Sequence, residues 1–376
     1  MIEIREVENR RQRKEFLNFP LKMYKDNPCF VPPLYGDEKK IFSKNYVYYD
    51  TCEAVYYNAY KDGVMAGRIS GILQKASNEK TGEKRVRFTR FDSVNDIEVA
   101  RALFDAVEDW ALSKGMDRVC GPLGFSDLER EGLLIEGFEH LATFEEQYNA
   151  PYYAELIEGC GYVKEIDWLE SRLMLPEDDG GELRSLTDQV MERYNLRFSE
   201  KMRINKFLKL YADDCFRLID EGYEGIYGSV PLTDKVKKML VSNFKLLLST
   251  DYVAVILDEN EKPVCMGLCI PSIARAVQKS SGRLTPGCIF RILRAKKNPE
   301  YIDLALIAVD KEYLNKGVSV CYMPGIIDLL KNTNAKWLET NLNLENNYPI
   351  LNMWKRFRGE NHKRRRSYIK VLNAAD

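Results

Sequence analysis

Hydrophobic and polar positions alternate along the chain in a way that predicts strands and helices in a definite order. Residues 53–73 hold two apolar and aromatic runs around a polar turn, which predicts a β-hairpin. Residues 85–94 alternate with the period of a strand, and residues 96–115 carry apolar side chains with the period of a helix. The predicted helical stripe consists of Val99, Leu103, Val107 and Trp110.

The second half of the chain repeats this order of elements. The first half continues with a predicted strand over 117–124, a helix over 150–161 and a strand over 171–176. The second half contains a predicted hairpin over 250–273, a strand over 301–309, a helix over 318–335, a strand over 336–344, a helix over 348–357 and a strand over 364–372. Pro324 predicts an uneven first turn in the helix over 318–335. This repetition predicts an α/β fold with mixed sheets in two tandem domains.

The stretch "LPEDDGGELRS", residues 175–185, combines proline, acidic residues and paired glycines, as a linker does. It divides the chain into a first domain over residues 1–178 and a second over residues 179–376. Two further helices, over 183–195 and 204–219, are expected to belong to the second domain.

Composition narrows the classes of protein that the chain can represent. Its 376 residues are 45% hydrophobic and 30% charged, and Lys+Arg 56 against Asp+Glu 57 leaves a net charge of −1. Bulk charge therefore favours neither nucleic acid nor a membrane surface. No apolar run is long enough to span a bilayer, and the first residues show no secretory pattern. Nine cysteines without a CxxC pair predict free thiols and a cytoplasmic protein, and two histidines far apart predict no metal site.

The order of hairpin, strand, glycine loop, helix, strand, helix and strand resembles the GCN5-related N-acetyltransferase (GNAT) superfamily. That family shows (Q/R)-x-x-G-x-(G/A) after its fourth strand and N-x-x-A-x-x-x-Y at its last helix. Residues 314–319, "LNKGVS", occupy the first pattern and keep only the central Gly317. Asn347 opens the second pattern, with Ile350 in the alanine place and Trp354 in the tyrosine place. In the first half, "RFDSVNDIEVA" has no glycine loop.

A narrower resemblance rests on three other stretches. The runs "YNAPYYAELIEGCGY", "GLLIEGF" and "NFPLKMYKDNPCFVPPLYGDE" resemble a bacterial group of paired GNAT-like proteins of unassigned substrate. The resemblance implies that acetyl-CoA or another acyl-CoA serves as co-substrate, without a metal.

A coenzyme A pyrophosphate needs several backbone N–H groups that point into one concavity at the start of a helix. The residues predicted to supply them are Asn315, Lys316, Gly317, Val318 and Ser319, with Asn347 at the last helix. The resemblance implies that two parallel strands splay apart and that pantetheine pairs with the backbone of Ile307, Ala308 and Val309. The alternative is an ordinary strand-to-helix turn with Gly317 at a positive φ.

Acyl transfer to an amine needs a base for the amine proton and a donor for the leaving thiolate. Glu339, late in the second splayed strand, is the candidate base, and Tyr348 is the candidate donor because Trp354 has no hydroxyl. The alternatives are a carboxylate in a salt bridge and a helix N-terminal aromatic residue.

Two charged stretches allow a structural interpretation as well as a functional one. In "NHKRRRSYIK", a strand would place Lys363 and Arg365 on one face and Arg364 and Arg366 on the other. This run predicts either an anion site or a solvated edge strand. The acids of "FSDLEREGLLIEGFE" are expected to be solvated, because they lie in loops.

The sequence leaves three alternative functions open. The first is an acyl-CoA-dependent N-acyltransferase that acylates an unidentified small-molecule or peptide amine, with the cofactor in the second half and a degenerate first half that shapes the acceptor cleft. The second is a Fem-type aminoacyltransferase that would bind tRNA through the basic run. The third is a catalytically silent binding protein, in which Phe290, Ile292 or Leu293 of the insert over 274–300 would fill the gap between the splayed strands.

Overall fold

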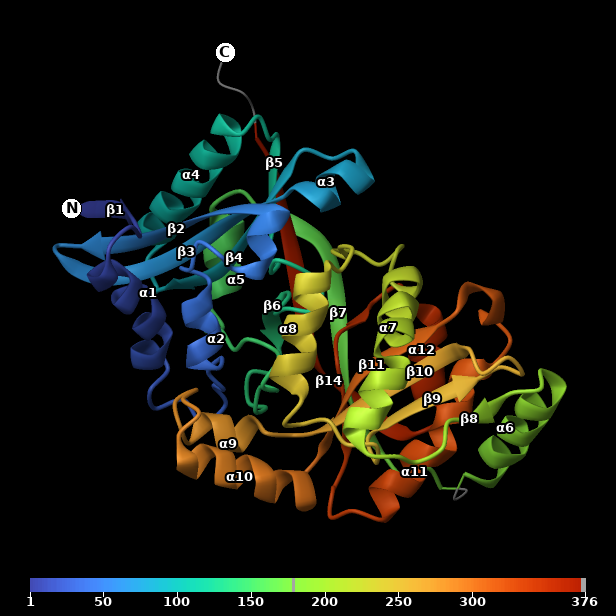
Figure 1. Ribbon diagram of the computed structural model, residues 1–376. Helices are drawn as coiled ribbons and strands as arrows, with labels where there is room; N and C mark the ends of the chain where they lie inside the picture. Colours follow the sequence, from blue (N-terminus) through green and yellow to red (C-terminus); the bar gives the residue numbers. More distant parts are fainter. Residues whose placement is uncertain (178–179, 373–376) are drawn as a thin grey trace. The chain divides into compact units, whose positions relative to one another are not determined.

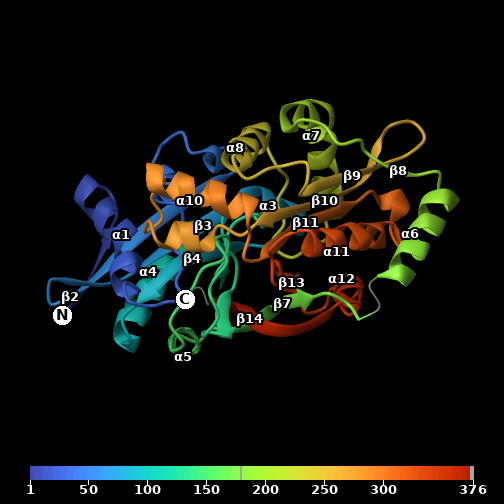
Figure 2. The same cartoon turned by 90° about the horizontal axis from the view of Figure 1, so that it is seen from below.

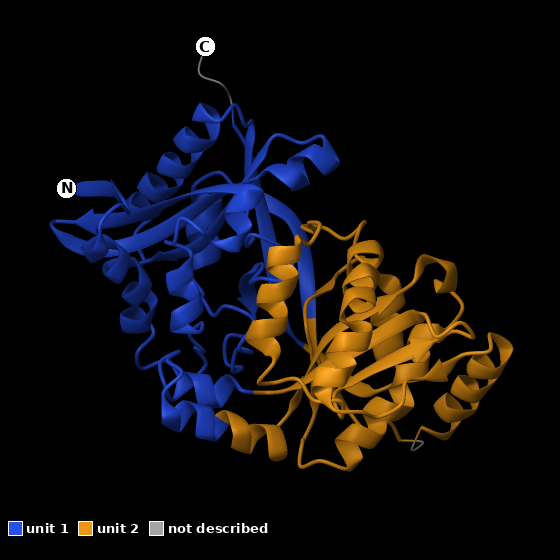
Figure 3. Ribbon diagram, in the orientation of Figure 1, with its two compact units in different colours: residues 1–169, 273–291, 362–376 blue, residues 170–272, 292–361 orange. Residues whose placement is uncertain are grey.

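The computed structural model describes residues 1–177 and 180–372, which form two compact units (Figure 3). Unit 1 consists of residues 1–169, residues 273–291 and the described residues from 362 onward, and unit 2 consists of residues 170–272 and 292–361. Each unit is therefore discontinuous along the chain. The boundary predicted between residues 178 and 179 lies outside the described residues, and the division at that point stays a prediction.

The elements predicted for the first half occur in the predicted order, together with further helices and strands that were not predicted (Figure 1). They are β1 (Ile2–Glu6), α1 (Arg10–Met23), α2 (Tyr35–Lys40), η1 (Val47–Asp50), β2 (Cys52–Lys61), β3 (Val64–Gln74), α3 (Lys75–Thr81), β4 (Arg85–Ser93), α4 (Ile97–Ser113), β5 (Arg118–Gly121), β6 (Leu133–Glu136), α5 (Tyr153–Gly159) and β7 (Val163–Met174).

The second half repeats this order and adds helices before its hairpin and after it. Its elements are α6 (Gly181–Arg193), β8 (Arg197–Phe198), α7 (Ile204–Gly222), α8 (Asp234–Phe244), β9 (Val253–Leu257), β10 (Pro263–Pro271), α9 (Ala274–Gln278), α10 (Pro286–Lys297), β11 (Ile302–Val309), η2 (Lys311–Tyr313), η3 (Val318–Tyr322), α11 (Met323–Lys331), β12 (Leu338–Thr340), β13 (Asn343–Leu344), α12 (Tyr348–Trp354) and β14 (Arg358–Val371).

The strands of the two units are arranged in the same way. In unit 1, β1, β2, β3 and β4 are successive antiparallel neighbours and β5 is parallel to β4. In unit 2, β8, β9, β10 and β11 are successive antiparallel neighbours and β12 is parallel to β11. The predicted α/β class with mixed sheets is confirmed.

The last strand of each unit comes from the other half of the sequence. In unit 1, residues 368–371 of β14 pair antiparallel with residues 118–121 of β5. In unit 2, Arg172 and Leu173 of β7 pair antiparallel with Glu339 and Leu338 of β12. The two halves of the chain therefore exchange their final strands.

Helix α4 packs on the sheet of unit 1 through the predicted stripe. A Cβ atom on Gly67 would lie 2.8 Å from Leu103 Cδ1, and one on Gly71 would lie 3.2 Å from the Trp110 ring. The helix can approach the sheet this closely because β3 carries glycine at both places. Of the four residues in the predicted stripe, Val99, Leu103 and Val107 have an exposed fraction of 0%.

Helices cover both faces of the unit 2 strands. Met323 and Ile327 of α11 share a buried cluster with Ile302 and Leu304 of β11. Helix α7 packs against β10 and β11 on the opposite face (Figure 2). The helix predicted over 318–335 is shorter and is divided into η3 and α11. Pro324 lies in the first turn of α11, where its missing N–H breaks no helical hydrogen bond.

Candidate cofactor and acyl-transfer site

The two parallel strands of unit 2 separate after a short paired stretch. Residues 302–304 of β11 pair with residues 338–340 of β12. The Asn341 N–H then donates to the Leu304 carbonyl at 3.3 Å. Beyond Leu304, β11 continues to Val309 and pairs only with β10 among the described strands. This leaves one backbone edge of β11 unpaired with any described strand beyond Leu304, next to Gly222 at the end of α7.

Hydrogen bonding in antiparallel pairs alternates, and this alternation identifies the backbone groups on that edge. The Asp310 N–H donates to the Val264 carbonyl at 2.8 Å, so Asp310 faces β10. By alternation, Ala308 also directs its backbone groups to β10, whereas Ile307 and Val309 direct theirs to the separated edge. Two of the three predicted pantetheine partners thus lie on this edge. The Tyr223 hydroxyl donates to the Ile307 carbonyl at 3.3 Å, so a side chain already holds one edge group.

The loop after β11 turns at two residues in the left-handed region. Asn315 has a φ of 61° and Gly317 a φ of 79°. A Cβ atom on Gly317 would meet only Val190 Cγ2, at 3.4 Å, so the backbone conformation rather than crowding explains the glycine. The exposed Lys316 ammonium lies 5.0 Å from the centre of the Tyr313 ring and 5.3 Å from that of Tyr194.

The predicted loop residues are contiguous and lead directly into η3. Gly317 is the N-cap of η3, and the N–H groups of Val318 and Ser319 belong to its first turn. The first N–H groups of a helix have no intrahelical acceptor. Val318 is buried in a cluster against which the partly buried Val309 packs, so η3 begins beside β11. A loop, a helix start and a separated strand edge therefore lie together in unit 2.

Glu339 lies in the middle of β12, one residue before the strands part, and its exposed fraction is 2%. The strand register places it beside Asp303 of β11 and Arg172 of β7. Trp337 Nε1 donates to Glu339 Oε2 at 2.8 Å, and Arg172 Nε lies 3.5 Å from the same oxygen. The ion pair considered from the sequence is present, and a role of Glu339 as base stays a prediction.

The residues predicted at the last helix lie in contrasting surroundings. Asn347 is the N-cap of α12 and makes no side-chain capping bond. Tyr348 follows it and has an exposed fraction of 66%. Trp354 is buried and donates through Nε1 to Asn343 Oδ1 at 3.3 Å. The residue in the tyrosine place of the family pattern is therefore a core residue.

The equivalent edge in unit 1 is occupied by tyrosine side chains. The Val94 N–H donates to the Ala66 carbonyl, so Ser93 faces away from β3 as Val309 faces away from β10. The Tyr153 hydroxyl accepts from the Ser93 N–H at 3.0 Å, and the Tyr152 hydroxyl donates to the Ser93 carbonyl at 2.8 Å. Sequence patterns did not identify these tyrosines, because a Tyr-Tyr pair before a helix predicts core packing equally well.

The Tyr153 hydroxyl belongs to a buried network. It lies 2.8 Å from the Tyr24 hydroxyl and 3.4 Å from Asp92 Oδ1, and Arg68 Nε donates to Asp92 Oδ2 at 2.8 Å. Burial raises the pKa of Asp92, although Arg68 and the two tyrosines favour its ionised form. Asp92, near the end of β4, is therefore part of the buried core of unit 1.

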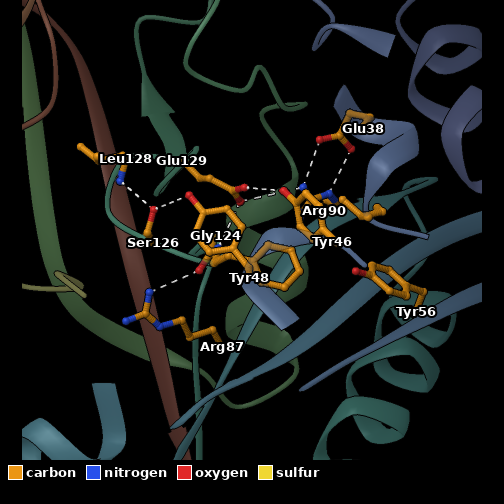
Figure 4. Close-up of polar contacts among 12 residues, drawn as sticks. Glu38, Tyr46, Tyr48, Tyr56, Arg87, Arg90, Gly124, Ser126, Leu128 and Glu129 are labelled. Atoms are coloured by element: carbon orange, nitrogen blue, oxygen red, sulfur yellow. Dashed lines mark hydrogen bonds and ion pairs between the residues drawn. The ribbon is translucent and has the colours of Figure 1, made fainter. Parts of the chain in front are cut away.

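A bulge in β4 directs Arg90 into a second polar group, the Arg90 cluster, which consists of Glu38, Arg90, Glu129 and Tyr46 (Figure 4). The register of β4 against β3 shifts between Asp92 and Thr89, and Arg90 has a φ of 51°. Arg90 Nε and Nη2 each donate to Glu38 at 3.0 Å, and Glu129 Oε2 lies 4.0 Å from Nη2. The Tyr46 hydroxyl donates to Glu129 Oε1 at 3.1 Å.

The carboxylates around this cluster have different proton affinities. Burial would raise the pKa of Glu38, but the charge and hydrogen bonds of Arg90 lower it to about 2. Burial raises the pKa of Glu129 and Glu131, and it raises that of Glu145 to about 7. The expectation that acids of this loop are solvated is wrong for Glu131, which is 4% exposed. Sequence alone could not reveal the burial of Glu131, because only the fold brings Arg87 and Glu146 near it.

The basic strand has the predicted alternation but not the expected surroundings. Lys363 and Arg365 are buried, whereas Arg366 Nε and Arg364 Nη1 donate to Asp167 at 2.8 Å and 3.1 Å. The expectation of an edge strand is wrong, because β14 has β5 and β7 as neighbours. Arg364 and Arg366 are engaged by Asp167, which leaves the tRNA alternative without the exposed run on which it depended.

The two histidines, far apart in sequence, bring their rings to 5.0 Å in unit 1. Across the described ranges, no group of three or more His, Cys, Asp or Glu side chains is arranged to hold a metal ion. None of the described helices combines the length and hydrophobicity needed to cross a bilayer. The nine cysteines are free thiols.

Two sequence relatives cover nearly the whole chain, whereas no protein-family model matches it. Protein YghO of Escherichia coli is 27% identical over 378 residues, which are 98% of this chain and 95% of that protein. The bacterial ceramide synthase of Caulobacter vibrioides is 21% identical over 372 residues, which are 96% of this chain and 94% of that protein.

Two solved GNAT proteins have a similar arrangement of elements. A tandem GNAT protein from the clavulanic acid biosynthesis pathway matches with a TM-score of 0.56 and 11% identity, over 100% of both chains. A GCN5-related N-acetyltransferase from Sphaerobacter thermophilus matches with a TM-score of 0.52 and 10% identity, over 100% of this chain and 97% of that one. The protein therefore has the fold of the GNAT superfamily. More particularly, it has the tandem form of that fold, as the order of its elements predicted.

Proposed function

We propose that the protein is an acyl-CoA-dependent N-acyltransferase and that unit 2 holds the acyl-CoA. The observation that supports this most strongly is the separated edge of β11, which leads through Gly317 into η3. Pantetheine would pair with the edge groups of Ile307 and Val309, in the manner of an added strand. The pyrophosphate would accept from N–H groups of residues 315–319, with Lys316 supplying a positive charge. The Lys316 N–H already donates to the Tyr313 carbonyl at 3.3 Å, so its backbone would have to exchange that partner.

The chemistry would follow the usual course of amide formation from a thioester. The amine nitrogen attacks the thioester carbonyl, a C–N bond forms and the C–S bond breaks. The amine proton passes to a base, for which we propose Glu339, and the departing thiolate takes a proton, for which we propose Tyr348. Because Glu339 is 2% exposed and paired with Arg172, a water molecule would have to relay the proton to it.

The sequence relatives suggest which acceptor to test first. A ceramide is the amide of a long-chain amino alcohol and a fatty acid, so its synthesis is an N-acylation. One relative, 21% identical in an alignment that covers 96% of this chain, is a bacterial ceramide synthase. We therefore propose a long-chain amine as acceptor and a fatty acyl-CoA as donor.

The silent alternative required that Phe290, Ile292 or Leu293 fill the gap between the splayed strands. Phe290 is 67% exposed and Leu293 is 45% exposed, so these two side chains fill no gap. Ile292 is fully buried. Tyr223 at the Ile307 carbonyl is the side chain that a bound pantetheine would have to displace.

Calorimetric titration of the full chain with acetyl-CoA and with acyl-CoAs of increasing length tests the proposal. We expect one acyl-CoA to bind per chain, with a sub-millimolar Kd that decreases as the acyl chain lengthens. Mass spectrometry should then detect the amide when sphinganine is added, and less of it with ethanolamine. No binding of any acyl-CoA at millimolar concentration would overturn the proposal.

A further inference from the structure

Helix α10 presents large apolar side chains to solvent. Cys288 and Ile292 have an exposed fraction of 0%, so this side of the helix faces the protein. The opposite side consists of residues 286, 289, 290, 293, 294 and 297, which share one face of a helix with 3.6 residues per turn. We call this set the outer face of α10. Its large apolar members are Ile289, Phe290 and Leu293, which are 38%, 67% and 45% exposed.

The apolar patch extends into the loop before the helix. Leu284, two residues before Pro286, is 53% exposed. Single exposed apolar residues are normal on a protein surface, but four within ten residues form a patch that marks a contact site. Three members of the patch lie on α10, and Leu284 lies in the loop that precedes it. Figures 1 and 2 show where this helix runs.

The charge of the same segment is of one sign. No acidic residue occurs between Glu261 and Glu300, although the whole chain has a net charge of −1. The basic residues between Glu261 and Glu300 are Lys262, Arg275, Lys279, Arg283, Arg291, Arg294, Lys296 and Lys297. The segment is therefore a local positive region on a nearly neutral protein.

Lys262 lies 3.5 Å from Asp310, whereas two cations of α10 are bonded to neutral groups. Arg291 Nη2 donates to Ser280 Oγ at 2.6 Å, and Lys296 Nζ donates to the Leu248 carbonyl at 2.7 Å. Neither bond neutralises the charge. Arg294 and Lys297, on the outer face, form no ion pair or side-chain hydrogen bond with the residues that the structure describes. Their charge is thus directed to solvent beside Phe290 and Leu293.

We propose that the outer face of α10 docks on the surface of an anionic lipid bilayer. A helix that combines exposed Phe, Leu and Ile with flanking Lys and Arg has the chemistry of an interfacial membrane helix, which inserts its apolar face and binds anionic headgroups. Nucleic acid would use the charges but would leave the four apolar side chains in water. The docking deepens the proposed function and rests on it for its purpose, because a long-chain amine resides in a membrane.

Sedimentation with extruded vesicles tests the docking without any substrate. We expect the full chain to bind vesicles of equal parts phosphatidylglycerol and phosphatidylcholine at least about tenfold more tightly than vesicles of phosphatidylcholine alone. The double variant Phe290→Ser/Leu293→Ser should lower the partition coefficient at least about tenfold. The matched control is Leu210→Ser, because Leu210 is a 50% exposed leucine on α7. This control should bind vesicles like the unaltered protein.

Other outcomes overturn the docking. They are no vesicle binding, binding that the double variant does not weaken, and a dimer in sedimentation velocity that the double variant dissolves while vesicles remain unbound. The last result would assign the outer face of α10 to a second copy of the chain. Circular dichroism of the variant checks that the helix persists, which is expected because Cys288 and Ile292 are unchanged.

A separate measurement distinguishes this inference from the proposed function. Acyl-CoA titration in the absence of vesicles should give the same Kd for the double variant and the unaltered protein. If acyl-CoA fails to bind but vesicles bind through the outer face of α10, the function falls and the docking stands. If acyl-CoA binds and vesicles do not, the docking falls and the function stands.

Discussion

The end of β4 in unit 1 and the end of β11 in unit 2 occupy equivalent places in the same fold but have different neighbours. At Ser93, tyrosine hydroxyls hold both the N–H and the carbonyl group. At Val309, no side chain among the described residues bonds the equivalent groups, and Gly317 turns the chain into η3. The same topology thus ends in one unit at a residue whose backbone groups are bonded by side chains, and in the other at a residue whose backbone groups no described side chain bonds.

The paired parts of the splayed strands differ as well. One position before the strands separate, unit 1 has Val86 opposite Val119, and unit 2 has Asp303 opposite Glu339. Both valines have an exposed fraction of 0%. Apolar residues in unit 1 therefore replace the carboxylates that unit 2 keeps near its candidate site. Together with the tyrosines, this supports assigning the cofactor to unit 2.

The largest expected effect concerns the carboxylate that unit 1 lacks. Glu339→Gln should lower kcat by about 10²–10⁴, because the amide cannot take the amine proton. The Kd for acyl-CoA, measured by calorimetry, should not change. Glu360→Gln, an exposed carboxylate on β14, is the matched control. Unchanged kcat in Glu339→Gln, with the product measured by mass spectrometry, would remove Glu339 from the mechanism.

The next effect concerns the loop that only unit 2 possesses. Gly317→Glu should weaken acyl-CoA binding about a hundredfold, because it places a negative charge where the pyrophosphate would lie. Gly317→Ala is the control. It also forces a side chain into the left-handed region, which costs about 1–2 kcal/mol, but it adds no charge. Equal losses of affinity in both variants would show that backbone strain, rather than phosphate binding, explains Gly317.

A smaller effect tests the tyrosine hydroxyls that bond the Ser93 backbone in unit 1. Tyr153→Phe should lower the free energy of unfolding by about 1–3 kcal/mol, because the Ser93 N–H and Tyr24 would lose a buried partner. The acyl-CoA stoichiometry should remain one per chain. Tyr348→Phe, at a 66% exposed position, should leave stability unchanged in the same urea titration. A Tyr153→Phe variant that binds a second acyl-CoA would show that the tyrosines alone close unit 1.

The smallest effect concerns Glu145 in unit 1. Its pKa is raised by burial to about 7, so the folded state holds a proton that the unfolded state releases near pH 4.5. Stability should therefore fall by up to about 2 kcal/mol as the pH rises from 4.5 to 7. Glu145→Gln should remove this loss in urea titrations across that range. An unchanged pH profile in the variant would assign a normal pKa to Glu145.

Local patterns were sufficient to predict most elements of the fold. The stripe on α4, the two hairpins and the position of the glycine loop follow from periodicity and turn residues within short windows. The exchange of β7 and β14 could not be predicted in this way, because pairing between Arg118 and Val371 leaves no trace in either strand. The split between η3 and α11 was signalled by Pro324, but its extent depends on packing.

For the candidate site, the sequence also predicted local features but no contacts between distant residues. The sequence predicted the loop that follows β11, because glycine at residue 317 marks a left-handed position. The positive φ of Asn315 was not predicted. It could not predict that Tyr152 and Tyr153 close the other edge, or that Arg90 meets Glu38 and Glu129. These contacts join residues far apart in sequence, and tertiary structure alone brings them together.

The strand exchange has a consequence for how the protein is made. Unit 1 completes its sheet only when β14 pairs with β5, yet β14 leaves the ribosome after nearly all of unit 2. Until then β5 presents an unpaired edge, and such an edge invites pairing with another nascent chain. Contacts of this sequence separation also form slowly. The sheet of unit 1 therefore remains incomplete until the last strand has been synthesised.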